Sequence, residues 1–203
     1  FYFTTCGWMM WNWLVSGLLL KSTIYLYDGS PFYPNSEILW NFVDSEKINF
    51  MGVSAKYIDA LSKENINVIE KYKLANLEII GSTGSPLIHE SFDYIYNSVK
   101  KDVSVASLSG GTDIVGCFIG GNPLSVVRRG EIQGPILGMD VHVYDEDANS
   151  LKNEKGELVC IKSFPSMPLF FWNDKNNEKY HDAYFNKYEN VWCHGDYILK
   201  TEN

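Results

Sequence analysis

Runs of apolar residues alternate along the first half of the chain with stretches whose apolar residues recur every three to four positions. The runs are typical of buried strands and the periodic stretches of amphipathic helices. We expect strands over 23–27, 48–53, 77–80 and 103–107. We expect helices over 36–43, 54–64 (with Ser54 as its cap) and 89–100. This alternation predicts a parallel sheet with helices packed on its faces.

A strongly apolar run, 6–20, precedes these elements. A membrane-spanning helix needs about 20 consecutive apolar residues. This run is shorter, is interrupted by polar Asn12 and Ser16, and ends at Lys21. We therefore expect a buried helix and no membrane span.

The pattern changes from about Asn122. Turn residues become frequent, and short stretches such as 139–144 and 156–161 read as strands. Segment 191–199 reads as strand, turn and strand, with Asp196 at the turn. Short strands with turns at this spacing favour an antiparallel or barrel-like arrangement. The predicted fold class is therefore α/β: a parallel sheet with flanking helices over 1–121, followed by a smaller β-barrel-like subdomain over 122–203.

Two glycine-rich turns follow predicted strands, at 81–86 and 109–113. In the second, two adjacent glycines remove side-chain bulk, so that a ligand can approach the backbone closely. Thr112 offers a hydroxyl donor and Asp113 a carboxylate, a pair that suits phosphate and Mg²⁺. Taken alone, this stretch is more simply an open turn capped by Thr and Asp. Because ligands bind at the carboxyl ends of parallel strands, the two turns can line one cleft, which favours a binding site.

Composition and charge exclude several classes of function. The 203-residue chain is 45% hydrophobic and has a formal net charge of −8, and its longest basic cluster is Arg128-Arg129, so we expect no nucleic-acid partner. The four cysteines form no C-x-x-C pair, which argues against a zinc site and a disulfide framework and suits a reducing, cytoplasmic location. The sequence contains no G-x-G-x-x-G, G-x-x-x-x-G-K-[ST] or G-x-S-x-G motif, and its four histidines lack ligand spacing.

Seven short motifs then follow one another along nearly the whole chain. Each is weak alone, but in this order they resemble adenylate-forming acyl-CoA ligases, and most closely the branch that activates acetoacetate. The motifs are Thr4–Trp13, Tyr27–Pro31, Ser107–Val115, Arg129–Gly134, Gly156–Val159, Phe164–Pro168 and Trp192–Asp196. The resemblance implies part of the large N-terminal domain of such a ligase.

The resemblance also implies a nucleotide site. Thr112 would contact the α-phosphate and Asp113 would hold Mg²⁺, as the catalytic pair, although the family more often has Glu at the second position. Asp196 would accept hydrogen bonds from the ribose hydroxyls, which a carboxylate can do. Ser85, in the loop beside the adenine, replaces an acidic residue of the family. The implied nucleotide-binding residues are Gly84, Ser85, Pro86, Ser109, Gly111, Thr112 and Asp196.

An acyl pocket is implied at four further positions: Met9, Met10, Thr83 and Gly110. Acetate-activating relatives resemble this chain but have Trp where Gly110 stands, and that Trp closes the pocket beyond a methyl group. Glycine would leave room for a four-carbon acid. A methylene-sized space is worth about 1–3 kcal/mol of discrimination. We therefore expect Gly110→Trp in a complete ligase to shift preference from acetoacetate toward acetate.

The implied reaction is ATP-dependent and has two halves. The carboxylate of acetoacetate attacks the α-phosphate of ATP, which releases pyrophosphate and leaves an acyl-adenylate. The thiol of CoA then displaces AMP to give acetoacetyl-CoA. ATP, Mg²⁺ and CoA are thus the expected cofactor and co-substrates, and small molecules are the expected partners.

Two parts of such a ligase are missing from the sequence. The phosphate loop with its Lys would lie before Phe1, and the C-terminal domain with the adenylation Lys would lie after Asn203. We therefore expect a piece of a longer protein that does not turn over alone. Two alternatives stay open: a ligase for another short acid such as butyrate or propionate, and a non-catalytic nucleotide-binding module.

Overall fold

The computed structural model describes residues 1–202 and divides the chain into two compact units. The first unit is Phe1–Gly134, and the second begins at Pro135. Residues 122–134, which we had grouped with the β-rich subdomain, fall in the first unit. Within this segment the Gln133 amide donates to the carbonyl oxygens of Asn122 and Ser125, both at 2.8 Å.

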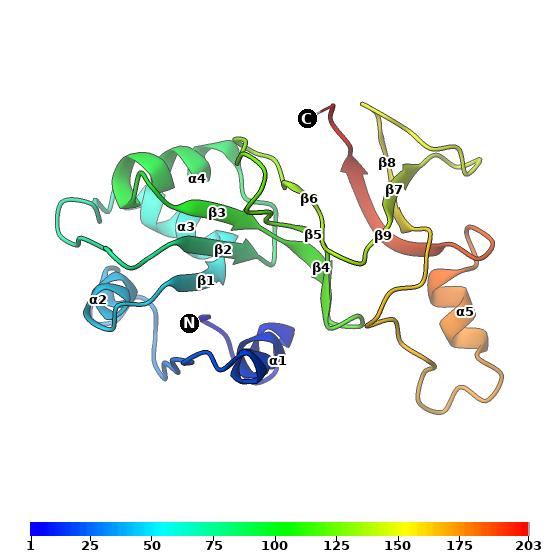
Figure 1. The fold of residues 1–203 in the computed structure, drawn as a ribbon, viewed down its shortest axis with the longest axis horizontal. Coiled ribbons are helices and arrows are strands. Elements are labelled where there is room, and N and C mark those ends of the chain that lie inside the picture. The colour runs from blue at the N-terminus through cyan, green and yellow to red at the C-terminus, as the bar shows by residue number, and fades with distance from the viewer. Residues whose placement is uncertain (203) are drawn as a thin grey trace. The chain divides into compact units, whose positions relative to one another are not determined.

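A three-stranded parallel sheet forms the centre of the first unit (Figure 1), as predicted. Its strands are β1 (Phe50–Ser54), β2 (Ile79–Thr83) and β3 (Ser104–Ser107), in the order β1-β2-β3. The register pairs Ser54 with Thr83 and Ser82 with Ser107, so the strands end at the same edge.

Helices cover both faces of this sheet. In β1, Met51 and Val53 pack into a large core with α2 (Ile38–Ser45), α3 (Ala55–Lys63) and α4 (His89–Tyr94). Phe50 packs on the other face, against residues of α1 (Met9–Ser16) in a smaller cluster. Successive side chains of a strand point to opposite faces, which is why one strand serves both cores. The predicted helix-covered sheet is confirmed.

The helices begin and end close to their predicted limits. Ser54 caps α3, because its Oγ accepts a hydrogen bond from the N–H of Tyr57 at 3.2 Å. The single helix expected over 89–100 is instead α4 followed by a π-helical segment, η2 (Ile95–Val99).

Segment 23–27, predicted as a strand, joins no sheet. The rings of Tyr25 and Tyr27 pack against Phe42 of α2, with centroids 5.9 and 5.7 Å apart, while Leu26 is exposed. The alternating pattern therefore arises from an extended segment lying on a helix. A strand pairing was missed elsewhere, since Tyr2 forms a parallel bridge with Gly52 beside β1.

The apolar run near the start forms α1 (Met9–Ser16) and a 3-10 turn, η1 (Gly17–Leu20). Met9, Met10 and Leu14 are buried, but Leu19 and Leu20 are 87% and 82% exposed, so the buried helix expected here is buried on one side only and its last turn is exposed. Within residues 1–202, no helix is both long and apolar enough to cross a membrane.

A small sheet follows β3, and its first two strands pair antiparallel. It contains β4 (Ser109–Gly111), β5 (Gly116–Gly120) and the two-residue β6 (Gly134–Pro135). Of the stretch 109–113, expected to be an open turn, residues 109–111 form a strand, and 112–113 begin the hairpin turn that spans 112–115.

The second unit is built on an antiparallel sheet of three strands in the order β7-β8-β9. These are β7 (Val141–Tyr144), β8 (Lys155–Cys160) and β9 (Trp192–Leu199), with α5 (Glu178–Tyr184) before β9. Trp192 is fully buried, and its ring stacks on Tyr184 with centroids 3.7 Å apart. The short strands are confirmed, whereas the barrel-like arrangement is not. Segment 191–199 is one irregular strand, so Asp196 lies within β9.

Candidate functional site

The ends of β2 and β3 meet through two hydrogen bonds. The Thr83 hydroxyl donates to the carbonyl oxygen of Leu108 at 3.1 Å, and the N–H of Leu108 donates to the carbonyl oxygen of Ser82 at 2.9 Å. This places the start of the Gly84–Pro86 loop beside the start of β4. The two glycine-rich segments singled out in the sequence therefore lie together at the carboxyl edge of the parallel sheet, where such folds bind ligands.

Residues of the predicted acyl pocket lie on α1 and on β2. Met9 and Met10 are 7% and 2% exposed and cluster with Tyr2 and Leu14. The indole of Trp8 lies against Gly84, where a Cβ would be 3.7 Å from its Cζ2. Gly84 has φ +87°, a conformation that glycine adopts without strain. Trp8 therefore brings the N-terminal segment into contact with the loop Gly84–Pro86, which the family resemblance places beside the adenine.

Thr112 and Asp113 stand at the tip of the β4–β5 hairpin. Both are exposed, so a ligand can reach their side chains. The N–H of Val115 closes the turn on the carbonyl oxygen of Thr112 at 3.3 Å, and Val115 has φ +48°. A β-branched residue rarely adopts a positive φ, and such strain is frequent at functional sites.

Gly110 is required by the hairpin itself. A Cβ at this position would overlap the main-chain atoms of Gly116 and Cys117 on β5. The direction in which a side chain would leave Gly110 therefore points at the neighbouring strand. Close backbone packing is a reason for glycine here that the sequence did not reveal.

The donors present suit a cation held mainly through a substrate. Within residues 1–202, no three His, Cys, Asp or Glu side chains come together as a metal cage. Mg²⁺ is typically bound by one or two carboxylates together with substrate phosphates and water, so the exposed Asp113 fits that cation without further protein ligands.

The ribose candidate, Asp196, belongs to the second unit. Its side chain is 58% exposed, and the Nε2 of His194 lies 3.6 Å from its carboxylate. Gly195 between them has φ +91°, and its N–H donates to Glu157 Oε1 at 2.7 Å. Sequence reasoning assigned no role to Glu157. The sequence signal that could have identified it is an acidic residue in a strand whose neighbouring positions are buried.

Similar proteins were found among curated sequences, although no family model matches this chain. The acetoacetyl-coenzyme A synthetase of Rhizobium meliloti (strain 1021) is 54% identical over 201 residues, which are 99% of this chain and 31% of that protein. The mouse acetoacetyl-CoA synthetase is 46% identical over 196 residues, 97% of this chain and 29% of its own length. The chain belongs to the acetoacetyl-CoA synthetase family.

A solved structure agrees with this assignment. The acetoacetyl-CoA synthetase from Streptomyces lividans superposes with a TM-score of 0.93 at 41% identity, over 99% of this chain and 32% of that one. The chain thus spans about a third of the length of these relatives. The α/β architecture is accordingly that of the matching part of an acetoacetyl-CoA synthetase.

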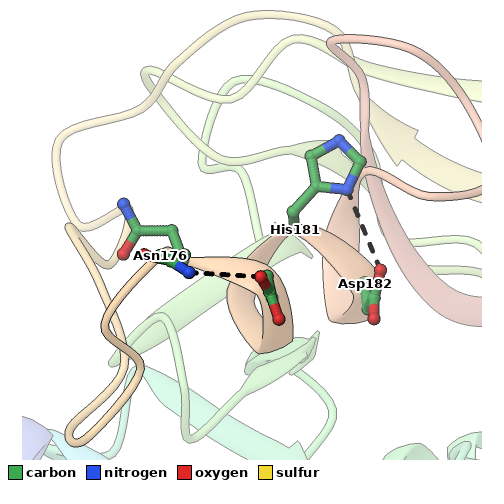
Figure 2. Close-up of a pocket in the computed structure, with 5 residues that line it drawn as sticks. Asn176, His181 and Asp182 are labelled. Atoms are coloured by element: carbon green, nitrogen blue, oxygen red, sulfur yellow. Dashed lines mark hydrogen bonds and ion pairs between the residues drawn. The ribbon is translucent and has the colours of Figure 1, made fainter.

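A surface depression on the second unit is separate from all these residues. It is lined by residues from Asn176 to Asp182 (Figure 2), around the start of α5. Asn176 donates to Glu178 Oε1 at 3.3 Å, and His181 Nδ1 lies 4.0 Å from the Asp182 carboxylate. It contains no residue that the family resemblance assigned to a ligand.

Proposed function

We propose that this chain supplies the acid- and nucleotide-binding part of an AMP-forming acid–thiol ligase that converts acetoacetate to acetoacetyl-CoA. The main support is the 54% identity to the Rhizobium meliloti protein along 99% of the chain. The meeting of the β2 and β3 ends beside the hairpin of Thr112 and Asp113 supports it independently.

In this proposal the tip of the β4–β5 hairpin binds the phosphates of ATP. The Thr112 hydroxyl donates to a phosphate oxygen and helps to orient the α-phosphorus toward the acid. Asp113 holds Mg²⁺, which when bound neutralises charge on the phosphates. The carboxylate oxygen of the acid forms the new bond to phosphorus, and the bond to pyrophosphate breaks.

The remaining nucleotide contacts are those that the family resemblance implies. Gly84, Ser85 and Pro86 border the adenine, with Ser109 and Gly111 beside the phosphates, and Asp196 accepts from the ribose hydroxyls. A carboxylate can accept hydrogen bonds from two neighbouring hydroxyls, which matches a ribose diol. The chain carries these groups on exposed or half-buried positions, where a ligand can approach them.

The acid would lie toward Met9, Met10, Thr83 and Gly110. Methionine adapts its shape to irregular apolar space, which suits a small acyl group. Thr83 is half-buried at the end of β2, one residue from the adenine-loop candidate. CoA is the second substrate, and its thiol displaces AMP from the acyl-adenylate. The cytoplasmic location expected from the cysteine pattern stays a prediction.

The test uses a chimera in which this chain replaces the matching 201 residues of the Rhizobium meliloti protein. We expect acetoacetate-dependent exchange of pyrophosphate into ATP. Asp113→Asn should lower the exchange rate by about 100-fold, because Mg²⁺ and the phosphates lose a ligand that acts in the transition state. Asp147→Asn, the same change at an exposed position of the β7–β8 connection, should leave the rate unchanged.

If Asp113→Asn leaves the rate of pyrophosphate exchange unchanged, the proposal that the hairpin binds the phosphates is wrong. A folded chimera that binds ATP without catalysing exchange with any acid would instead favour a non-catalytic nucleotide-binding module. If pyrophosphate exchange is faster with butyrate or propionate, the chain serves the proposed ligase chemistry, but its substrate is not acetoacetate.

A further inference from the structure

Glu157 is a buried carboxylate within β8. Its side chain is only 5% exposed, and burying a charge is costly unless it is paired and hydrogen-bonded. The N–H of Gly195 donates to it at 2.7 Å and the Nζ of Lys187 at 3.4 Å, and the thiol of Cys193 also hydrogen-bonds with it. One of these donors is main chain, and it belongs to the residue directly before the ribose candidate Asp196.

The β8–β9 pairing is irregular at this point. Glu157 pairs with Tyr197 and Val159 pairs with Cys193, so a two-residue step on β8 faces a four-residue step on β9. Gly195 lies in the bulged stretch and has φ +91°. A bulge takes main-chain groups out of the ladder and re-aims the side chains next to it. The Glu157 carboxylate therefore replaces the ladder partner for the Gly195 N–H.

A cation and a second acid complete the network. Lys187 also lies 3.4 Å from Glu146 Oε1, to which the Tyr197 hydroxyl donates at 3.0 Å. Burial opposes the charge of Lys187, but its hydrogen bonds to Glu146 and Glu157 outweigh burial and raise the pKa of the ammonium. Lys187 thus stays charged at neutral pH and compensates the buried carboxylate.

We propose that Glu157 is a positioning residue for the nucleotide site. By holding the N–H of Gly195 it fixes the β9 bulge that presents the Asp196 carboxylate to the ribose hydroxyls of ATP. The inference rests on the proposed function for Asp196 contacting ribose, and it adds the residue that sets the geometry of that contact.

The first arm of the test needs no nucleotide. Hydrogen exchange of the Gly195 amide is measured in the 203-residue chain and in three variants. Glu157→Leu should speed this exchange by about tenfold or more, because the amide loses its carboxylate acceptor, and a sulfur acceptor such as the neighbouring Cys193 is weak. Glu157→Gln keeps an acceptor oxygen and should retain protection. Glu154→Leu, the same change at an exposed position, is the matched control.

The second arm reads ribose recognition in the chimera. The ratio of KM for 2′,3′-dideoxy-ATP to KM for ATP should be about 10- to 100-fold, as expected for hydrogen bonds to a charged group. Asp196→Ala and Glu157→Leu should each bring it near one, whereas Glu157→Gln and Glu154→Leu should keep it. If Glu157 had a merely structural role, Glu157→Leu would change the KM values for both nucleotides together and leave their ratio unchanged.

The outcomes separate the two claims. If Asp196→Ala leaves the ratio unchanged, the ribose role in the proposed function is wrong. If Asp196→Ala collapses the ratio but Glu157→Leu does not, Asp196 keeps its role and the positioning inference fails. Unchanged exchange of the Gly195 amide in Glu157→Leu overturns the inference on its own, even if the chimera does not fold.

Discussion

At the scale of single residues, Gly110 has two possible reasons to be glycine. Its family resemblance implies space for a larger acid, whereas the structure adds a steric reason, because a Cβ would overlap the backbone of Gly116 and Cys117. The steric reason can be tested on the isolated chain by measuring its free energy of unfolding. It also means that a Gly110→Trp exchange alters the hairpin that carries Thr112 and Asp113 together with any pocket wall.

We expect Gly110→Ala to lower the free energy of unfolding by about 1–3 kcal/mol, the usual cost of forcing extra atoms into a packed site. The matched control is Gly7→Ala, since a Cβ at Gly7 meets nothing within 4 Å, and its effect should stay within about 0.5 kcal/mol. Urea unfolding of the chain measures both. Equal stability of the two variants would show that the hairpin tolerates a side chain at position 110.

At the scale of elements, an ion pair ties the loop before β6 to α4. Arg129 donates to both oxygens of Asp93, at 2.8 and 2.6 Å. These hydrogen bonds hold the pKa of the Asp93 carboxyl below its usual range. Gly130, next along the loop, has φ +79°, and a Cβ there would overlap the His89 ring at the start of α4. The loop is therefore fitted closely to that helix.

The lowered pKa predicts a pH dependence. A carboxyl whose pKa is depressed on folding contributes stability above its unfolded pKa of about 3.9, and loses it as the pH falls through the folded value. The stability difference between the chain and Asp93→Asn should thus be full at neutral pH and shrink below about pH 4. Asp102→Asn, at an exposed position, serves as the comparison. A difference that persists unchanged into acid would exclude the ion pair as its source.

Elements with strong local signals could be predicted from the sequence. The strands of the parallel sheet and α3 follow from apolar runs and from the Ser54 cap, which act within a few residues. Elements that depend on distant partners could not. The Tyr2–Gly52 bridge joins residues fifty positions apart, and β4 is a glycine-rich strand that pairs with β5. Segment 23–27 shows the converse error, since its alternation reflects packing on α2.

The same distinction applies to the candidate site. That the turns after β2 and β3 share one edge could be inferred from the parallel order of strands, and the Thr83–Leu108 hydrogen bond agrees with it. The role of Glu157 could not be inferred, because it depends on a bulge in β9 and on the φ of Gly195. Neither leaves a local pattern in the sequence.

At the scale of the whole molecule, the chain divides into two compact units. Thr83, Thr112 and Asp113 belong to the first, and Asp196 belongs to the second. The chain spans about a third of the length of its acetoacetyl-CoA synthetase relatives, so the complete reaction is best measured with the chimera. In our proposal, this segment belongs to a ligase that acts on acetoacetate.

The most direct measurement is a competition. The chimera is given ATP, Mg²⁺, CoA and equal concentrations of acetoacetate, butyrate, propionate and acetate, and the CoA thioesters and AMP are quantified by mass spectrometry. We expect acetoacetyl-CoA as the main thioester, by about tenfold or more over each competitor, with one AMP per thioester, because the chain is 54% identical to an acetoacetyl-coenzyme A synthetase along 99% of its length and a pocket of fixed size discriminates between acids of different length. Butyryl-CoA or acetyl-CoA as the main product, or thioester without AMP, would contradict the proposed function.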